Sequence, residues 1–341
     1  MNQANSMKAA VLETHGGPFR YATVARPVPG QGQVLVRIAA SGINPLDLKI
    51  RSGEAAHAKQ ALPAVLGIDL AGVVVSVGPG VISFSKGDEV FGMTGGVAGV
   101  QGSLAEYAAV DADLLAIKPG NFSMREAAAL PLVFITAYEG LIDRANVRSG
   151  QTVLVQGGGG GIGHVAIQLA VAKGAKVFAT GSGSQSDFIQ SLGATPINYQ
   201  TTSVEKYVAE HTGGRGFDVV YDTVGGASLD ASFKAVAQFG HVVSALGWGT
   251  HSLAPLSFRA ASYSGVFTLL PLITGVGRAH HGEILREATR LAESGALLPQ
   301  LDSRRFGLQS VADAHALLAG RKTLGKLVVD VSRSSEVEHV I

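Results

Sequence analysis

The sequence predicts an α/β protein with two domains, one rich in short β-strands and one built around a doubly wound parallel sheet. A length of 341 residues favours two domains over one. Short strand patterns separated by glycine and proline fill the first third of the chain. From Thr152 onward, strand and helix patterns alternate, and this order is typical of parallel strands with helices on both faces of the sheet.

The first third is predicted to form a small antiparallel barrel or sandwich. Its apolar and β-branched runs predict strands over 34–39, 70–77, 88–92 and 103–110. A helical region is expected to follow from Ser123, because Ser123 and Glu126 have the spacing of a capping box. This region extends to residue 144.

The second half alternates between strand and helix. The predicted strands are 153–155, 176–180, 196–199, 218–221 and 241–246, and the predicted helices between them are 162–172, 188–192, 204–211 and 229–237. The pattern then becomes mixed, with helices over 282–294 and 310–319 and a strand over 324–331. The polar tail after this strand is expected to fray.

Composition excludes several classes of function. The net charge of +1 gives no electrostatic footprint for nucleic acid or for an anionic membrane. The chain contains no cysteine, which removes disulfides and every cysteine-based metal site. The polar N-terminus lacks the apolar core of a signal peptide, and the apolar stretch 266–273 is too short to span a bilayer. We therefore expect a soluble, cytoplasmic protein.

The run from Gly157 to Gly163 predicts a dinucleotide-binding turn. It follows a predicted strand, opens a predicted helix, and fits the spacing Gly158-x-Gly160-x-x-Gly163. An early glycine makes the tight turn, Gly160 lets the backbone approach a diphosphate, and Gly163 lets helix and strand pack closely. The diphosphate is then expected at the N-terminus of the helix, with contacts from Gly158, Gly160, Gly161, Ile162 and Gly163.

The loop after the next strand favours NADPH over NADH. NAD-binding enzymes usually place an Asp or Glu there to hold the ribose hydroxyls. Here the loop has no acid before Asp187, and Ser182 and Ser184 are available to donate hydrogen bonds to a 2′-phosphate. The Arg or Lys that usually reads this phosphate is absent from the loop.

Taken together, several short motifs resemble the medium-chain dehydrogenase/reductase superfamily, and within it the zinc-independent quinone oxidoreductase branch that includes ζ-crystallin-like proteins. The motifs are at residues 42–47, 66–73, 77–78, 87–90, 102–107, 157–163, 218–226 and 325–329. The resemblance covers nearly the whole chain, from about residue 7 to residue 331.

The resemblance implies a domain arrangement. A GroES-like, β-rich catalytic domain would contain residues 7–132 and 300–332, and a Rossmann NADPH-binding domain would contain residues 133–299 between them. Residues 1–6 and 333–341 would be flexible termini.

The resemblance also implies that the chain lacks zinc. Zinc-dependent members place a catalytic Cys where this chain has Asn44, and a Gly-His-Glu where it has Gly67, Ile68 and Asp69. Without a Lewis acid, reversible alcohol oxidation is disfavoured. Hydride transfer to a quinone or to the β-carbon of an α,β-unsaturated carbonyl is expected instead, because delocalisation carries the resulting charge.

Candidate site residues follow from the same resemblance. The expected catalytic residues are Asn44, Asp47 and Lys49. Asn44 matches a residue beside the nicotinamide, although from local pattern alone Asn44 before Pro45 is a turn former. Lys49 stands at a cleft position where some bacterial members have tyrosine. Two interpretations are open: Lys49 is an ordinary surface charge, or it is a cation that polarises a substrate carbonyl.

The remaining candidates concern the cofactor and the substrate. Thr136 is expected near the nicotinamide ribose or carboxamide, and Tyr199 near the adenosine 2′-phosphate. Trp248 is a candidate for the substrate wall. Further cofactor-binding positions are Asn44, Thr223, Leu246 and Lys326.

The predicted function is an NADPH-dependent reductase of small-molecule quinones or enones. An enoyl-thioester reductase and a non-catalytic NADPH-binding protein are the alternatives. A homodimer is also expected, because the apolar segment 265–270 reads as an exposed edge strand.

Overall fold

The computed structural model describes residues 5–332, and these residues form two compact units. One unit, here the mixed-sheet unit, contains the chain up to Leu132, Leu269–Ser294 and the chain from Pro299. The other, here the parallel-sheet unit, contains Val133–Thr268 and Gly295–Leu298. The predicted flexible termini lie largely outside the described residues. Ser6 is an exception, since it pairs with Ala25 at the start of a strand.

Two sheets form the mixed-sheet unit. Their strands are β1 (Ser6–Leu12), β2 (Phe19–Ala25), β3 (Gln33–Gly42), β4 (Ala64–Val65), β5 (Asp69–Val77), β6 (Glu89–Met93), β7 (Tyr107–Asp111), β8 (Leu115–Ile117), β15 (Phe306–Gly307) and β16 (Val328–Asp330). The small sheet has the order β2-β1-β4, and the large one β15-β16-β3-β5-β6-β8, with β7 also paired to β3. Most of the pairs are antiparallel, as predicted for this part of the chain.

Sequence patterns missed part of this unit. No strand was predicted over β1 or β2, and the strand predicted over 103–110 begins only at Tyr107. The alternation of β1 is weak because four of its seven residues, Ala9 to Leu12, are consecutively buried. Such a run does not show the period of two that identifies a half-exposed strand.

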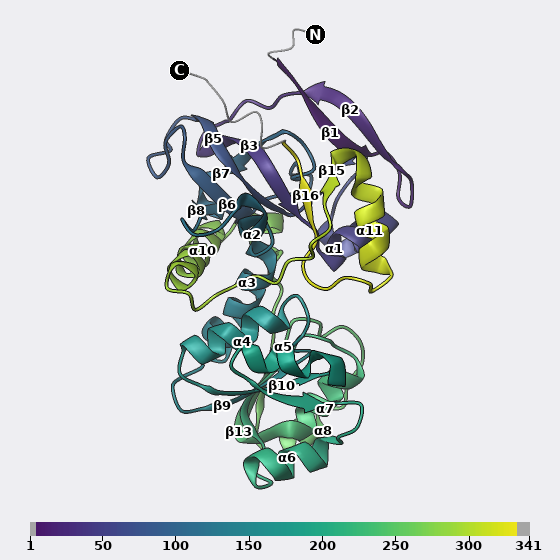
Figure 1. The fold of residues 1–341 in the computed structure, drawn as a ribbon, viewed down its shortest axis with the longest axis vertical. Helices are drawn as coiled ribbons and strands as arrows, with labels where there is room; N and C mark the ends of the chain where they lie inside the picture. Colours follow the sequence, from purple (N-terminus) through teal and green to yellow (C-terminus); the bar gives the residue numbers. More distant parts are fainter. Residues whose placement is uncertain (1–4, 333–341) are drawn as a thin grey trace. The chain divides into compact units, whose positions relative to one another are not determined.

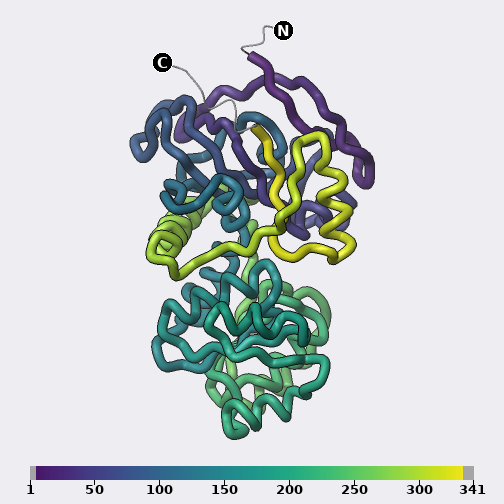
Figure 2. The backbone as a smooth tube through the Cα atoms, viewed as in Figure 1, coloured from purple at the N-terminus to yellow at the C-terminus, as the bar shows by residue number. Residues whose placement is uncertain are grey.

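The C-terminal part of the chain completes the mixed-sheet unit. Strand β16 pairs with β3 through Val328 and Gly42, so the last strand lies beside one from the first third. Figure 2 shows this return as yellow tube next to purple and blue. Four helices of the unit are α1 (Pro45–Ser52), α2 (Met124–Ala128), α10 (Arg278–Glu293) and α11 (Val311–Ala319). Helix α2 begins at the predicted cap, where the Ser123 N–H donates to the Glu126 carboxylate at 2.8 Å.

Helix α10 corrects the predicted domain boundary. Residues up to 299 were assigned to the Rossmann domain, but Leu269–Ser294 belong to the mixed-sheet unit. The apolar side of α10 is buried, and Gly282 lies so close to Asp113 that a Cβ there would be 2.6 Å from the Asp113 carbonyl oxygen. The Asn121 amide also donates to the Ala292 carbonyl at 2.8 Å. These contacts attach α10 to β8 and its neighbouring turn.

The parallel-sheet unit has six strands in the order β11-β10-β9-β12-β13-β14, all parallel. They are β9 (Thr152–Gln156), β10 (Lys176–Gly181), β11 (Thr195–Asn198), β12 (Phe217–Asp222), β13 (Val236–Ser244) and β14 (Ser262–Gly265). Numbered from β9, this is the order 3-2-1-4-5-6 of dinucleotide-binding sheets. The prediction of a doubly wound parallel sheet is therefore confirmed.

Helices cover this sheet, as Figure 1 shows. They include α4 (Gly163–Ala172), α5 (Ser186–Ser191), α6 (Val204–Thr212), α7 (Ala227–Ala235) and α8 (Ala254–Ser257). One core cluster joins Leu154, Phe178 and Val220 of the strands to Leu229 and Phe233 of α7. The middle residues of the two central strands, Val153–Val155 and Val219–Tyr221, are buried and apolar because both faces of a parallel sheet are covered.

The segment 265–270 is not the exposed edge strand that was predicted. Strand β14 ends at Gly265, and Leu270 already begins helix α9 (Leu270–Thr274). Val266 and Leu269 are buried. Val266 belongs to the parallel-sheet unit and Leu269 to the mixed-sheet unit, and the apolar character of both is matched by burial rather than by an exposed edge.

Within residues 5–332, no helix is both long enough and apolar enough to cross a membrane.

Candidate functional site

The carboxyl ends of the parallel strands gather most of the predicted cofactor residues at one edge of the parallel-sheet unit. The glycine turn follows β9, Ser182 follows β10, Thr223 follows β12 and Leu246 follows β13. Because neighbouring parallel strands end at the same edge, these residues lie together. Ligands of open α/β sheets bind at this edge, where the strand order reverses.

Different physical constraints require glycine at different positions of the turn. Gly157 has φ +78°, a conformation that side chains disfavour. A Cβ on Gly158 would be 2.7 Å from the Ala179 side chain, and one on Gly163 would be 2.1 Å from the Gly157 carbonyl oxygen. These three positions are therefore required by the fold.

Gly160 is not required by the fold in this way. Its φ is not in the left-handed region, and a Cβ there would meet only the Gly157 carbonyl oxygen, at 3.2 Å. Gly160 and Gly161 are both exposed. At Gly160 and Gly161 the backbone is therefore exposed to solvent and carries no side chain, so a ligand can approach it closely.

Helix α4 begins beside this bare backbone without a side-chain cap. Its N-cap residue is Ile162, which has no oxygen to accept from the first N–H groups. The positive end of the helix dipole therefore faces the turn, as in an anion-binding site. Gly160 is held in place by the His164 ring, whose Nδ1 lies 3.0 Å from the Gly160 carbonyl oxygen.

Two residues that the motif did not identify fix the start of the turn. The Thr180 hydroxyl donates to the Gln156 side chain at 2.8 Å and accepts from the Gly157 N–H at 3.0 Å. The Thr223 hydroxyl donates to the Gln156 carbonyl at 2.7 Å. Neither Gln156 nor Thr180 belongs to the glycine spacing, and only pairing β9 with β10 and β12 brings them there.

The loop after β10 is folded around Gln185. The Gln185 side-chain oxygen accepts from the Ser182 N–H at 3.0 Å, and the hydroxyls of Ser182 and Ser184 lie 2.9 Å apart. Gln185 also lies over the glycine turn, since a Cβ on Gly159 would be 2.3 Å from its amide nitrogen. Tyr199 is 60% exposed, and its N–H donates to the Gly181 carbonyl at 3.2 Å. Ser182, Ser184 and Tyr199 therefore flank one end of β10.

Thr136 is buried in the same unit. Its hydroxyl lies 3.1 Å from that of Thr268, and its carbonyl accepts from the Tyr221 hydroxyl at 2.7 Å. Burial raises the pKa of Tyr221 well above its usual value, so this tyrosine stays protonated. Trp248, after β13, is 55% exposed and packs edge-on against Phe267.

In the mixed-sheet unit, the structure brings Asn44 and Lys326 together with Asp69. The Asn44 amide nitrogen donates to the Asp69 carboxylate at 2.9 Å, and the Lys326 ammonium donates to the Asn44 amide oxygen. The ammonium also donates to the Ile43 carbonyl at 3.1 Å.

Asp47 lies against this group at the start of α1. One of its carboxylate oxygens accepts from the Asn44 N–H at 2.8 Å, and the other, Oδ1, is buried without a hydrogen bond. Burial raises the pKa of Asp47 to about 7 and that of Asp69 to about 6, against the opposing effect of the Lys326 charge. Burial also lowers the pKa of Lys326.

Lys49, the third predicted catalytic residue, is on the exposed side of α1. Its ammonium makes no hydrogen bond or ion pair with any residue of the described chain. A lysine in this state retains all three donors for a ligand.

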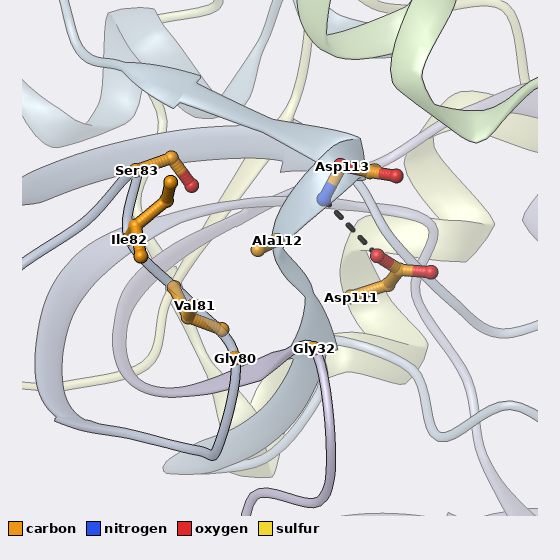
Figure 3. Close-up of a pocket in the computed structure, with 8 residues that line it drawn as sticks. All are labelled: Gly32, Gly80, Val81, Ile82, Ser83, Asp111, Ala112 and Asp113. Carbon is orange, nitrogen blue, oxygen red and sulfur yellow. Dashed lines mark hydrogen bonds between the residues drawn. The ribbon is translucent and has the colours of Figure 1, made fainter.

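A separate hollow of about 300 Å³ on the mixed-sheet unit contains none of the predicted residues. It is lined by Gly32, by Gly80–Ser83 and by Asp111–Asp113 at the end of β7 and in the turn after it, as Figure 3 shows. The Asp113 N–H donates within it to Asp111 at 3.0 Å. Nothing in this lining indicates chemistry.

The residues around Asn44 do not suit a zinc ion. Ile68 has no ligand atom, and the side-chain oxygen of Asn44 is already hydrogen-bonded to a cation, the Lys326 ammonium. In residues 5–332, no three His, Cys, Asp or Glu side chains are grouped as metal ligands would be.

Comparison with known proteins places both units in one family. Residues 30–120 match the alcohol dehydrogenase GroES-like domain, and residues 192–329 match the zinc-binding dehydrogenase family. The chain is 39% identical over 314 residues to a 2-methylene-furan-3-one reductase of Solanum lycopersicum, covering 90% of this chain and 74% of that protein. It is 35% identical over 334 residues to a chloroplastic NADPH-dependent alkenal/one oxidoreductase of Arabidopsis thaliana, covering 95% and 79%.

A solved structure agrees with these matches. It is an alcohol dehydrogenase superfamily protein from Novosphingobium aromaticivorans, 60% identical, with a TM-score of 0.94 over 96% of this chain and 100% of that one. The chain therefore belongs to the medium-chain dehydrogenase/reductase superfamily and is an oxidoreductase.

Proposed function

We propose that this oxidoreductase is a zinc-independent reductase that transfers hydride from NADPH to an α,β-unsaturated carbonyl or a quinone. The observation that carries the proposal is the bare backbone at Gly160 beside the uncapped start of α4, followed by a loop without an acid. A relative that is 35% identical is an NADPH-dependent alkenal/one oxidoreductase, which supports the same cofactor and substrate class.

The parallel-sheet unit would bind most of the cofactor. The turn from Gly158 to Gly163 would bind the diphosphate through N–H groups, and Ser182, Ser184 and Tyr199 would bind the 2′-phosphate. Thr136, Thr223 and Leu246 of the same unit would bind the nicotinamide half. In the mixed-sheet unit, Asn44 and Lys326 are cofactor-binding candidates on the family resemblance. Bound NADPH supplies the hydride, and the protein supplies the positions and the charges.

In this proposal the substrate is already electrophilic, because the side chains around Asn44 offer no ligand set suited to zinc. When hydride adds to the β-carbon of an enone, the carbon–carbon π bond breaks and the electron pair moves to the carbonyl oxygen as an enolate. The Lys49 ammonium can donate a hydrogen bond to this oxygen, where negative charge develops. A proton from solvent then adds to the α-carbon. In the parallel-sheet unit, Trp248 is the candidate for the substrate wall.

Turnover with a panel of acceptors tests the proposal. We expect the purified protein to oxidise NADPH in the presence of enones, exocyclic methylene ketones or quinones, with a lower KM for NADPH than for NADH. The reductase hypothesis fails if NADPH binds tightly and no acceptor accelerates its oxidation; that result identifies a non-catalytic NADPH-binding protein. Activity confined to enoyl-CoA esters would instead identify an enoyl-thioester reductase.

We also propose a homodimer, formed through the edge of the parallel sheet. Strand β14 is the last strand in the sheet, and in the described chain it pairs only with β13. Ser262 and Tyr263 are exposed along it. Antiparallel pairing of β14 with its copy about a two-fold axis would continue the sheet and cover the edge.

Light scattering after size exclusion, at micromolar concentration, tests the dimer. We expect a dimer for the natural chain and a shift towards monomer for Ser262→Lys, because a lysine on an edge strand opposes strand pairing. A monomer for the natural chain would exclude the proposed dimer.

A further inference from the structure

Asn44 is the N-cap residue of α1, but its side chain does not accept a hydrogen bond from the first N–H groups of the helix. Its backbone has φ −125° and ψ 153°. Asparagine is among the best N-cap residues because its oxygen accepts from the first N–H groups of a helix. Here the amide is turned into the interior instead, towards Asp69 and Lys326.

The two partners allow only one orientation of this amide. Lysine can only donate, so it must face the amide oxygen, and an ionised carboxylate can only accept, so it must face the amide nitrogen. Rotating the amide by half a turn would place its NH2 group against the Lys326 ammonium and its oxygen against the Asp69 carboxylate, and neither pair can form a hydrogen bond. Lys326 and Asp69 together therefore fix both the position and the direction of the Asn44 side chain.

The group joins three distant segments of the chain. Asp69 begins β5, Lys326 lies two residues before β16, and Asn44 begins α1. The second oxygen of Asp69 accepts from the Leu132 N–H at 2.9 Å. Asn44 and Asp69 are fully buried, and Lys326 is 7% exposed.

Burying the charges of Asp69 and Lys326 costs free energy of desolvation, so the pair is not expected to stabilise the fold strongly. The desolvation penalty of a buried ion pair often equals or exceeds its Coulombic gain, and apolar side chains of similar volume are frequently as stable. The hydrogen-bonded group of Asn44, Asp69 and Lys326 is therefore better explained by the position in which it holds Asn44 than by a gain in stability. Because Asn44 is the N-cap residue, this position fixes the start of α1.

Helix α1 depends on that start for its orientation. It has only eight residues, too few to be stable alone in water. The buried side carries Asp47, which accepts from the Asn44 N–H, and the exposed side carries Lys49. A shift of Asn44 is therefore transmitted to Lys49 within two turns of helix.

We propose that Asp69 and Lys326 are positioning residues: by fixing the Asn44 side chain they set the orientation of α1 and thereby place the Lys49 ammonium for the substrate oxygen. This inference rests on the proposed function in one respect, namely the contact between Lys49 and the substrate. Neither Asp69 nor Lys326 needs to touch the substrate for this role.

Asp69→Ala and Asp69→Asn form a matched pair that tests the proposal. The alanine variant removes the acceptor for the Asn44 amide, whereas the asparagine variant keeps an oxygen in place. With NADPH and an accepted enone, we expect kcat to fall about 10- to 100-fold in Asp69→Ala, the range for a misplaced catalytic group. We expect most of kcat to be recovered in Asp69→Asn. The Kd of NADPH should change much less than kcat in both variants, because the glycine turn and the loop after β10, which would bind the phosphates, are untouched.

A double variant separates positioning from general damage. If Asp69 acts through Lys49, then Lys49→Met with Asp69→Ala is no slower than Lys49→Met alone, because residues that act as one unit are not additive. If the two losses in kcat multiply, the proposal is overturned. An unchanged kcat in Asp69→Ala overturns it as well.

A measurement that does not depend on turnover distinguishes failure of this proposal from failure of the proposed function. The rate of Lys49 acylation, followed by mass spectrometry of its peptide, reports the surroundings of its ammonium whether or not any acceptor is reduced. We expect this rate to change in Asp69→Ala and to stay near the natural value in Asp69→Asn; equal rates in all three proteins contradict the proposal. If Asp69→Ala does not fold, Asp69→Leu replaces it, since leucine also removes the acceptor for the Asn44 amide but fills the volume of the carboxylate.

Discussion

Replacing Gly160 with valine is expected to abolish NADPH binding and to leave the fold intact. A Cβ at this position meets only one atom within 4 Å, at 3.2 Å, and the backbone has no left-handed φ to strain. The Gly157 carbonyl must shift by only a few tenths of an ångström, so the free energy of unfolding should change by about 1 kcal/mol at most. The added methyl groups would occupy the space through which the diphosphate approaches, which should weaken binding by about 100-fold or more.

Gly163→Val is the matched control for this prediction. Its Cβ would lie 2.1 Å from the Gly157 carbonyl oxygen, so the turn itself must move. We expect this variant to lose both stability and binding. Fluorescence titration with NADPH and thermal denaturation measure the two quantities separately, and natural affinity in Gly160→Val would show that the diphosphate binds elsewhere.

Replacing Lys49 with methionine is expected to lower kcat about 100- to 1,000-fold, the loss seen when one donor to a developing oxyanion is removed. The ammonium is exposed and has no partner in residues 5–332, so its loss should not affect the thermal midpoint. The Kd of NADPH should also stay close to the natural value, because the contact is with the substrate. Steady-state kinetics with a saturating enone measures the effect.

Two further variants define this result. Lys49→Arg keeps a charged donor and should recover part of kcat. Lys86→Met removes another exposed lysine of the mixed-sheet unit and should leave kcat unchanged. Natural kcat in Lys49→Met would remove Lys49 from the chemistry and leave the enolate to be stabilised by delocalisation and solvent.

The glycine turn was predictable because its determinants are local. A strand, a fixed spacing of glycines and a helix lie within about twenty residues. Each glycine has its own steric or ligand-binding role, so the spacing of the glycines identifies the turn. The alternation of strand and helix then gave the parallel sheet, whose observed order is that of a dinucleotide fold. Gln156 and Thr180 escaped notice because they contribute through strand pairing rather than spacing.

The group around Asn44 was not predictable from local patterns. Asn44 and Lys326 are 282 positions apart, and Asn44 before Pro45 has the pattern of an ordinary turn. Only the resemblance to a known family marked Asn44, and it indicated nothing about Asp69 as its partner. The domain boundary near residue 269 was misplaced for a related reason: amphipathic periodicity predicts that α10 is a helix but not which sheet it covers.

Transfer of deuterium from the cofactor tests the central claim most directly. The measurement uses the natural protein after dialysis against a zinc chelator, NADPH carrying deuterium at C4 of the nicotinamide in either the R or the S position, and an enone that the protein accepts. We predict a saturated ketone with one deuterium on its β-carbon, derived from only one of the two labelled cofactors. A product without cofactor-derived deuterium, or a reaction that stops on chelation and returns with zinc, would contradict direct, zinc-independent hydride transfer.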